Sequence, residues 1–365
     1  MRVGVVGGGV VGLAVAGDLA ERGVSVTLYE RGELGAGATG RAAGICYDAF
    51  ADPTDAAVAQ RALERYREWD LLADRPYVWV AREESDATAI AAQVTEMRAN
   101  GVDAERLDPA TLGERYPELD TGGVTVAAIA HSAGVLDPEA VLAHLTDRAR
   151  ATGAVVRTGT TVSLAGPRVV ETPGGVERFD AVVVAAGPAT KPIVADVGVS
   201  LALGSYRAQA LVTGPVGADL PSFYDATREF YWRPHDDGLL VGDGAHAVDP
   251  ADCATDADPD FVRSALDRVT EATTLDPSVD RAWAGCCTAT PDRDPLVGPV
   301  ADGCWVATGW QGHGLMRAPA MGEFVAQRLR GGASRLDAPL GEQFDPNRFD
   351  CDESFHPLGD PTADW

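Results

Sequence analysis

Apolar and polar positions in the first 30 residues follow two different periods. Residues 3–6 form an apolar run typical of a buried strand, and small or apolar residues from Leu13 to Ala20 repeat at helical spacing. A second β-branched strand follows and ends in Glu30. We therefore expect a strand, a glycine turn, a helix and a second strand, which together form a βαβ unit.

Helical and strand patterns alternate through the rest of the chain. Helices are predicted at 56–72, 88–99, 108–116, 137–152, 258–272 and 314–329. Strands are predicted at 77–81, 124–130, 155–162, 180–187, 207–213, 229–234, 238–242, 281–289 and 304–308, with a hairpin at 168–179. This order favours an α/β protein in which a Rossmann-like nucleotide domain is interleaved with an α+β domain that contains a mostly antiparallel sheet. The nucleotide domain is expected at 1–75, 131–204 and 284–345, the second domain at 76–130 and 205–283, and a C-terminal tail at 346–365.

The turn of the βαβ unit carries the spacing G-x-G-x-x-G. Gly7 permits a tight turn, Gly9 lets backbone approach a pyrophosphate, and Gly12 lets the helix pack closely on the sheet. The helix N-terminus offers N–H groups and a partial positive charge to phosphates. Glu30 lies where an acid bonds ribose hydroxyls and repels a 2′-phosphate, which disfavours NADP. The motif alone fits FAD or NAD, and the predicted contacts are Gly7, Gly9, Val10, Val11, Gly12, Glu30 and Arg31.

The chain is strongly acidic, with 55 acids against 30 bases and a formal net charge of −25. Lys191 is the only lysine, and the acids are scattered through the sequence. This balance argues against partners such as nucleic acids or anionic membranes. A dispersed acidic excess with almost no lysine suits the salt-rich cytoplasm of a halophile, so we expect stability to rise with molar salt.

Neither secretion nor a metal site is expected. The first strand begins at residue 2, and no apolar run reaches the ~20 residues that span a bilayer. The six cysteines form no C-x-x-C pair, so we expect free thiols, no metal and a cytoplasmic location.

Four motifs together resemble the FAD-dependent amine oxidoreductase family that includes D-amino-acid oxidase, glycine oxidase, monomeric sarcosine oxidase and the β subunits of proline dehydrogenases. The first is the N-terminal fingerprint with Glu30, and the second is the small-residue loop at 37–45. The third is the strand end at 183–187. The fourth is Thr290-Pro291-Asp292, followed by Gly-Trp-Gln-Gly-His-Gly-Leu at 309–315 and by Ala-Pro-Ala-Met-Gly at 318–322.

The resemblance implies that FAD is the cofactor and that the nucleotide domain is of the GR2 type, with a substrate-binding second domain. The Gly-His-Gly turn opens a helix, and in the family it contacts the flavin ring, so His313 is expected near the flavin rather than as a plain helix cap. Cys286 and Cys287 lie near the family's covalent attachment point but are offset from it, and we expect non-covalent FAD. Further implied contacts are Thr39, Gly40, Arg41, Ala42, Ala43, Gly44, Val162, Ala186, Gly187, Gly309, Gln311, Gly312, His313, Gly314 and Leu315.

The implied reaction is oxidation of a C–N bond in a small amine or amino acid, such as a D-amino acid, glycine, sarcosine or another N-alkyl amino acid. Hydride passes to flavin N5, and the imine formed hydrolyses in water. The chain departs from the family's substrate-binding pattern. Cys287 stands where glycine oxidases have an arginine, and Met316 stands where sarcosine oxidases have a lysine, which favours a dehydrogenase.

A carboxylate substrate still requires an arginine. The candidates are Arg233 and, less favoured because helical geometry points it outward, Arg317. Tyr206, Tyr231 and Trp232 are expected to wall the pocket, with core packing in the second sheet as the alternative for Tyr231 and Trp232. Predicted catalytic residues are therefore His313, Arg233, Tyr231 and Arg317.

Two alternatives remain open at the level of sequence. One is a flavoprotein subunit of a larger complex, similar to a proline or sarcosine dehydrogenase β subunit, with little activity alone. The other is an NAD-dependent Rossmann enzyme, which the later motifs disfavour. The expected partners are a small amine or amino acid and either oxygen or an electron-accepting protein or quinone, with a homo-oligomer also compatible.

Overall fold

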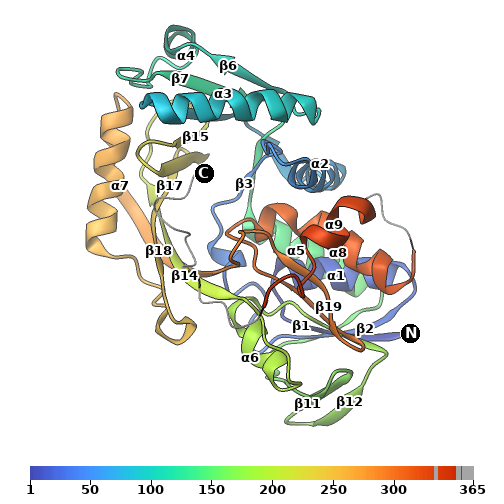
Figure 1. Ribbon diagram of the computed structural model, residues 1–365. Coiled ribbons are helices and arrows are strands. Elements are labelled where there is room, and N and C mark those ends of the chain that lie inside the picture. Colours follow the sequence, from blue (N-terminus) through green and yellow to red (C-terminus); the bar gives the residue numbers. More distant parts are fainter. Residues whose placement is uncertain (333–335, 351–354, 356–365) are drawn as a thin grey trace.

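A six-stranded sheet forms the centre of the nucleotide domain in the computed structural model, which describes residues 1–332, 336–350 and 355 (Figure 1). Its order is β19-β20-β13-β1-β2-β9, and all neighbours are parallel except β19, which runs antiparallel to β20. The chain order of strands is thus mixed across the sheet, as in doubly wound folds. The strands are β1 (Arg2–Val6), β2 (Ser25–Tyr29), β9 (Val155–Arg157), β13 (Ala181–Val184), β19 (Leu296–Ala301) and β20 (Cys304–Thr308).

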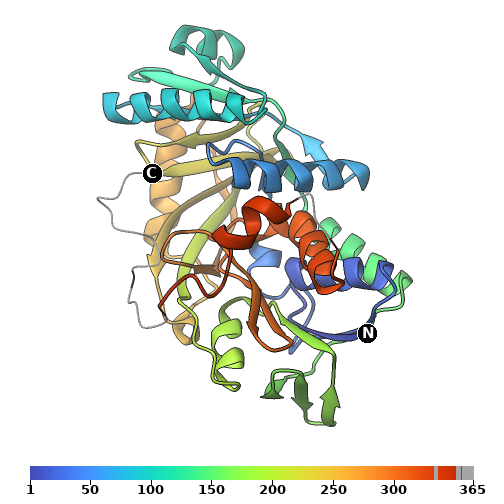
Figure 2. The same ribbon diagram turned by 45° about the vertical axis from the view of Figure 1, so that its right-hand side comes forward.

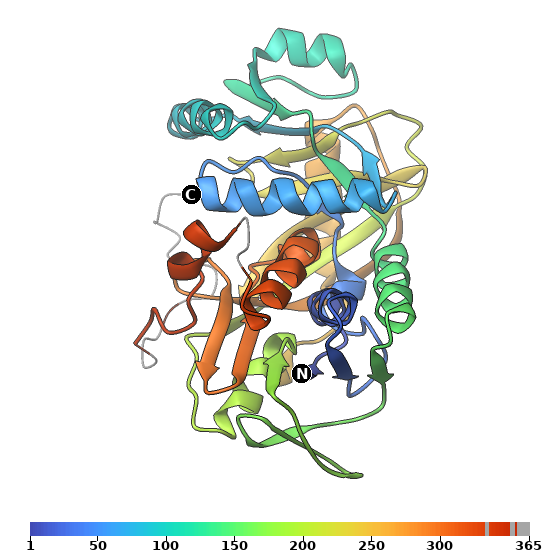
Figure 3. The ribbon, with the colours of Figure 1, turned by 90° about the vertical axis from the view of Figure 1, so that its right-hand side faces the viewer.

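Four helices pack around one apolar core beside this sheet. Helix α1 contacts both α5 and α8, and α8 in turn contacts α2. Figure 3 shows α2 lying between these helices and the second domain. The helices are α1 (Val10–Glu21), α2 (Pro53–Glu68), α5 (Pro138–Ala151) and α8 (Gly314–Leu329).

An eight-stranded sheet with the order β18-β14-β17-β16-β15-β5-β7-β6 forms the second domain. It is antiparallel except for the pair β15 and β5, which confirms the expected mostly antiparallel sheet. Its strands are β5 (Tyr77–Ala81), β6 (Ala104–Leu107), β7 (Val126–Ala130), β14 (Gly204–Thr213), β15 (Ser222–Asp225), β16 (Phe230–His235), β17 (Gly238–Ala247) and β18 (Val279–Ala289).

Helices cover both faces of the eight-stranded sheet (Figure 2). On β5, Val78 and Val80 join the core under α7 (Pro259–Ala272), whereas Trp79 and Ala81 join the core under α3 (Glu84–Ala99). Successive residues of β5 thus pack into two different apolar cores, one on each face of the sheet. The short α4 (Pro109–Arg115) follows β6.

Smaller elements complete the fold. Strands β3 (Ile45–Cys46), β8 (Gly134–Leu136) and β4 (Leu72–Asp74) form a small sheet. The predicted hairpin is confirmed as β11 (Val169–Thr172) and β12 (Gly175–Arg178), joined to β10 (Ser163–Gly166). The remaining helices are α6 (Thr190–Ala195), α9 (Asp337–Gln343) and 3-10 turns at Thr39–Arg41, Gly187–Ala189 and Pro250–Asp252.

Several predicted boundaries are wrong for local reasons. Helix α2 begins earlier than predicted because the Asp52 side chain caps it and Pro53 occupies its first turn. It ends at Glu68, and Asp70 then takes a left-handed conformation with φ 56° before β4 begins. The strand predicted at 155–162 is too long, because β9 ends at Arg157, and the next strand, β10, begins only at Ser163 in a separate sheet.

The proposed domain division at residues 283 and 284 falls inside β18, which runs on to Ala289 in the eight-stranded sheet. The division into domains stays a prediction, and residues 351–354 and 356–365 of the expected tail, with Cys351, lie outside the described residues. Among the described residues, no helix is long and apolar enough to cross a membrane, and no three His, Cys, Asp or Glu side chains gather as metal ligands.

Candidate active site

Three glycine turns meet at the carboxyl ends of adjacent parallel strands. Gly7 follows β1, Gly187 follows β13 and Gly309 follows β20, and all three have positive φ, at 112°, 56° and 79°. Because β13 lies between β1 and β20, the turns line one edge of the sheet. That edge is where open α/β sheets bind their ligands.

The first turn has no room for side chains. A Cβ on Gly12 would lie 2.0 Å from the Gly7 carbonyl oxygen, and one on Gly7 would lie 2.3 Å from the Ala185 oxygen. Gly9 is the N-cap of α1 and provides no side-chain cap. Val10 N donates to Thr39 Oγ1 at 3.1 Å. This bond connects the small-residue loop at 37–45 to the N-terminus of α1.

Glu30 faces this turn from the end of β2. Its carboxylate accepts hydrogen bonds from Gly8 N at 2.7 Å and Gly32 N at 2.8 Å. The acid is therefore held beside the pyrophosphate turn, where the sequence predicts a ribose contact. Arg31, next in the chain, is exposed.

The small-residue loop packs against the second domain. The Arg41 guanidinium donates to the carbonyls of Ala36 and Gly37 in its own loop, and Trp283 Nε1 of β18 donates to the Arg41 carbonyl at 3.1 Å. Arg41 thus braces the loop instead of pairing with a surface acid. Val162 and Ala186 both pack against the apolar core that contains Val184.

The Gly-His-Gly turn is held by the end of β18. Gly309 N donates to Thr288 Oγ1 at 3.2 Å, and Gln311 N donates to the Thr288 carbonyl at 2.9 Å. A Cβ on Gly309 would lie 2.6 Å from the Thr290 methyl, so the Thr-Pro-Asp stretch packs directly on this turn. His313 is the N-cap of α8 without a side-chain cap bond.

His313 is neutral in the folded protein. Burial, assisted by the nearby Arg317 charge, lowers the pKa of His313 to about 3. Its Nε2 lies 3.4 Å from the Tyr47 hydroxyl, and its ring meets those of Tyr47 and Phe50 edge-on, with centroids 6.3 and 5.8 Å away. The imidazole can therefore exchange a hydrogen bond but supplies no charge.

A group of tyrosines, here called the aromatic cluster, lies between this turn and the eight-stranded sheet; it consists of Tyr47, Tyr77, Tyr206, Tyr224 and Tyr231. Tyr47 stacks on Tyr77 with centroids 4.6 Å apart and planes 3° apart. The Tyr206 hydroxyl lies 3.1 Å from where a Cβ of Gly312 would be. Burial raises the pKa of Tyr47 and Tyr224 to about 12, so these hydroxyls stay neutral.

Sequence reasoning missed Tyr47, Tyr77 and Tyr224. The sequence contains only a weak signal for these residues: Tyr47 follows the small-residue loop at 37–45 by two residues, and Tyr77 alternates with Trp79 on a strand. Trp232, weighed as a pocket wall, is instead fully buried and stacks on Phe223 with centroids 4.0 Å apart. Neighbouring strand residues face opposite sides, so Tyr231 remains on the cluster side.

Arg233 is a buried cation that forms an ion pair with no carboxylate of the described residues. It is 5% exposed, and its guanidinium donates to the carbonyls of Ala43, in the loop at 37–45, and, at 2.8 Å, of Pro234. Burial lowers the pKa of Arg233 to about 10, opposed by the more distant Asp137 and Asp236. The charge is thus available to an anionic ligand beside Tyr231.

Arg317 does not point outward, as helical geometry alone had suggested. It is 3% exposed and pairs with Asp55 of α2 at 2.7 Å, with its guanidinium 5.1 Å from the Phe50 ring centroid. The reason is tertiary, since α2 packs over the first turns of α8. Its charge is already neutralised, which makes Arg317 a poorer carboxylate anchor than Arg233.

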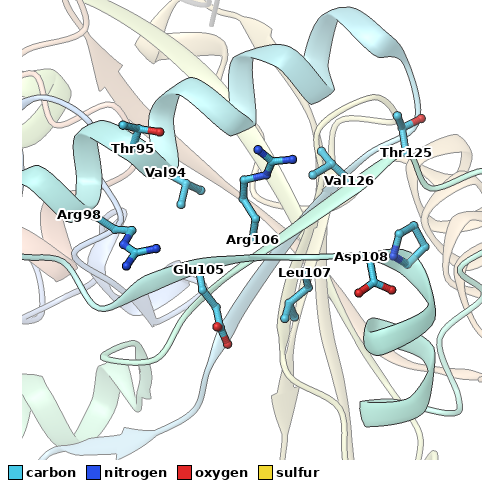
Figure 4. A pocket seen from close by; sticks show the side chains of 10 residues that line it. Val94, Thr95, Arg98, Glu105, Arg106, Leu107, Asp108, Thr125 and Val126 are labelled. Atoms are coloured by element: carbon cyan, nitrogen blue, oxygen red, sulfur yellow. The ribbon is translucent and has the colours of Figure 1, made fainter.

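An open pocket lies elsewhere, between α3 and the strands β6 and β7 (Figure 4). Figure 4 shows Arg98, Arg106 and Glu105 around it. It contains none of the predicted site residues, and it lies on the face of the second domain covered by α3.

The fold, together with the sheet edge lined by the turns at Gly7, Gly187 and Gly309, defines a Rossmann-type dinucleotide-binding protein. Its second domain faces the cofactor site. The N-terminus of α1, Glu30, the loop at 37–45 and the turn at 309–315 fit an FAD molecule, because they offer close backbone approach, N–H groups and one acid. The match of residues 2–328 to the family described as FAD dependent oxidoreductase (DAO) shows that the chain belongs to that family. FAD is accordingly its cofactor.

Individual relatives agree with this assignment. A glycine oxidase of Geobacillus kaustophilus (strain HTA426) is 28% identical over 233 residues, which span 59% of this chain and 62% of that protein. The structure of L-proline dehydrogenase from P. horikoshii superimposes with a TM-score of 0.88 at 26% identity, covering 95% of this chain and 97% of that one. The glycine oxidase structure from Geobacillus kaustophilus gives 0.85 at 24% identity over 95% and 99%, which concerns the fold alone.

Proposed function

We propose that this protein oxidises the C–N bond of a small amino acid or N-alkyl amino acid. The observation that carries this proposal is Arg233, a buried cation beside the aromatic cluster and the loop at 37–45 that has no ion-pair partner in the part of the chain that the structure describes. An arginine in such a site suits a substrate carboxylate, which it binds through charge-assisted hydrogen bonds. The family relationship and the relatives named glycine oxidase and L-proline dehydrogenase point to the same class of substrate.

FAD supplies the hydride acceptor of the reaction. The chain itself binds and orients the substrate: Arg233 holds the carboxylate, and Tyr231 lies on the same strand face. The aromatic cluster excludes water from the α-carbon, and neutral His313 with Tyr47 offers a hydrogen bond without adding charge. The substrate amine must be uncharged when hydride leaves, and no protein base is needed for that step. The imine product hydrolyses in water.

The electron acceptor is proposed to be a protein or quinone rather than oxygen. Met316 is buried at the Gly-His-Gly helix, and Leu239 to Val241 contribute no lysine to β17. The resemblance to sarcosine oxidases implies a lysine at the Met316 position and an oxygen-activating lysine in the strand that matches Leu239 to Val241, and this chain has neither. A subunit with little activity alone is not favoured by the comparisons. A cytoplasmic location and a homo-oligomer remain predictions.

Anaerobic reduction of the FAD-loaded protein tests the proposal. D-amino acids, sarcosine, glycine and proline are each compared with the matching amine that lacks the carboxylate. Bleaching of the flavin absorbance by at least one acid, and much weaker bleaching by its amine, is expected. Bleaching by none of the panel would contradict the proposal and support the subunit alternative. Reoxidation by an artificial acceptor but slowly by air would identify a dehydrogenase.

A further inference from the structure

Two neighbouring cysteines on β18 face opposite sides of the eight-stranded sheet. Cys286 pairs in register with Arg207 of β14, and Cys287 pairs with Tyr206. Because successive strand residues alternate between faces, Cys287 points toward the aromatic cluster and Cys286 points away from it. The Tyr206 hydroxyl lies close enough to Cys287 to influence the pKa of its thiol, which agrees with this placement.

A third cysteine, Cys253, lies in the segment that crosses the Cys286 face. Arg207 anchors this segment, since its guanidinium donates to the Ala254 carbonyl at 3.0 Å and to Asp258 Oδ2 at 2.8 Å. Ala284 N of β18 donates to the Thr255 carbonyl at 2.7 Å. Two residues before Thr255 and two after Ala284 are Cys253 and Cys286, so the register brings these two cysteines together.

The Cys253 and Cys286 side chains are therefore neighbours, which agrees with the effect of Cys253 on the pKa of Cys286. Both residues are half-buried, so a small solute can reach the pair. Burial, reinforced by the neighbouring Cys253 thiol, raises the pKa of Cys286. A thiol of raised pKa reacts slowly with peroxide, so Cys286 is assigned the second step, in which it resolves the oxidised product.

We propose that Cys253 and Cys286 form a redox-modification site that closes to a disulfide on exposure to hydrogen peroxide. The Cys253 thiolate attacks one peroxide oxygen, the O–O bond breaks, and water and a sulfenic acid form once protons are transferred. The Cys286 sulfur then attacks the sulfenic sulfur, an S–S bond forms and a second water leaves. In total two thiols lose two electrons and two protons, and one peroxide becomes two waters.

The position of this pair links it to the substrate side of the sheet. A disulfide would tether the segment at 253–258 to β18 one residue away from Cys287, which pairs in register with Tyr206. Tyr206 in turn lies against Gly312 of the Gly-His-Gly turn. The site is therefore built on the second domain, adjoining the aromatic cluster but outside it.

Peptide mapping of the FAD-loaded protein tests the proposal. The protein is treated with a few equivalents of hydrogen peroxide, free thiols are blocked, and peptides are analysed without reductant. A peptide pair joined through Cys253 and Cys286 is expected, and dithiothreitol should return both thiols. Cys253→Ser and Cys286→Ser should each abolish the linked pair, whereas Cys304→Ala, which removes a buried thiol from β20, should retain it.

Two results would overturn the proposal: oxidation of these cysteines only to sulfinic or sulfonic acids, or linkage of either one to a different cysteine. The measurement involves no amine substrate. Its failure is therefore distinguishable from failure of the proposed catalytic function.

Discussion

The charge of Arg233 is the most consequential side-chain feature of the site. This buried residue has no counter-ion within residues 1–332, 336–350 and 355, so it depends on a ligand. Arg233→Met should lower kcat/KM for an amino-acid substrate by about 10- to 100-fold, in line with about 1.5–3 kcal/mol for a charged hydrogen bond. The same variant should lose little activity toward the amine that lacks the carboxylate. Steady-state kinetics with both substrates check this. The matched control is Arg98→Met, an exposed arginine beside the remote pocket, and an equal loss for both substrates would contradict the anchoring role.

The Asp294 side chain should make the free energy of unfolding depend on pH. Burial, reinforced by Asp55 and Asp292, raises the pKa of Asp294 to about 6. A carboxyl whose folded pKa exceeds its unfolded value of about 3.9 stabilises the protein below that value, and the contribution is lost as pH rises through 6. Asp294→Asn should therefore match the wild type near pH 3.9 and exceed its stability above pH 6 by about 1–2 kcal/mol, discounted for partial exposure.

Urea unfolding of both proteins at several pH values between 4 and 7.5 measures this difference. The Gln343 Nε2 bond to Asp294 Oδ2, at 3.0 Å, can be kept by asparagine, which makes the substitution conservative. A stability difference that does not change with pH would show that the charge of Asp294 is not the cause.

The amino-acid sequence predicted the chemical role of site residues better than it predicted the direction of their side chains. His313 was expected near the flavin, and only the fold shows that burial keeps it neutral. Arg317 and Trp232 were misplaced because the direction of a side chain depends on which element covers it. Tyr47 meets Tyr77 only after two domains come together, so no local pattern marks the pair.

Among the elements, the turn into α1 depends on the absence of a side chain. In Gly12→Ala the new Cβ would meet the Gly7 carbonyl at 2.0 Å, so the turn must open and the pyrophosphate contacts are lost. FAD should bind at least ten-fold more weakly, measured as the ratio of flavin to protein absorbance after dialysis. Gly341→Ala, where no atom lies within 4 Å of the new Cβ, is the control and should keep its FAD. Full FAD retention in the Gly12 variant would argue against this turn as the binding site.

The contact between α2 and α8 depends on a buried ion pair. Asp55→Asn leaves the Arg317 charge buried and unpaired, and Arg317 Nε has no hydrogen-bond partner to compensate. We expect a loss of about 3 kcal/mol in the free energy of unfolding. The double variant Asp55→Asn with Arg317→Met should lose less than the single variant, because no unpaired charge remains.

Denaturant unfolding of the single and double variants measures this coupling. Asp260→Asn breaks an exposed pair with Arg263 and should leave the midpoint nearly unchanged. Additive losses in the double variant would mean that Asp55 and Arg317 are not coupled.

Element types were mostly predictable, whereas several ends were not. Strong signals such as the apolar run of β13 and the capped start of α5 gave elements close to those observed. The strand predicted at 155–162 failed because β9 is an edge strand that pairs with β2 over only three residues. Its length is decided by its neighbour, and this information is absent from the local pattern.

At the scale of the whole molecule, the net charge of −25 predicts a response to salt. Molar KCl shortens the screening length to about 3 Å and suppresses self-repulsion in the folded state. The thermal unfolding midpoint should therefore rise from low to molar KCl. An uncharged osmolyte at equal osmolality is the control, since it changes hydration without screening. An unchanged midpoint in KCl would contradict adaptation to a salt-rich cytoplasm, which stays a prediction.

The sequence by itself determined the βαβ unit, the dinucleotide turn, the interleaved α/β organisation and the resemblance to FAD-dependent amine oxidoreductases. These depend on local spacing: glycines that avoid a clash, apolar periods and strand ends. Only the tertiary structure decided which charges remain available. Arg233 has no counter-ion among the described residues, Arg317 is neutralised by Asp55, and Cys253 lies near Cys286 because segments distant in sequence pack together. Burial and partners set the state of an ionisable group, and both are properties of the folded chain.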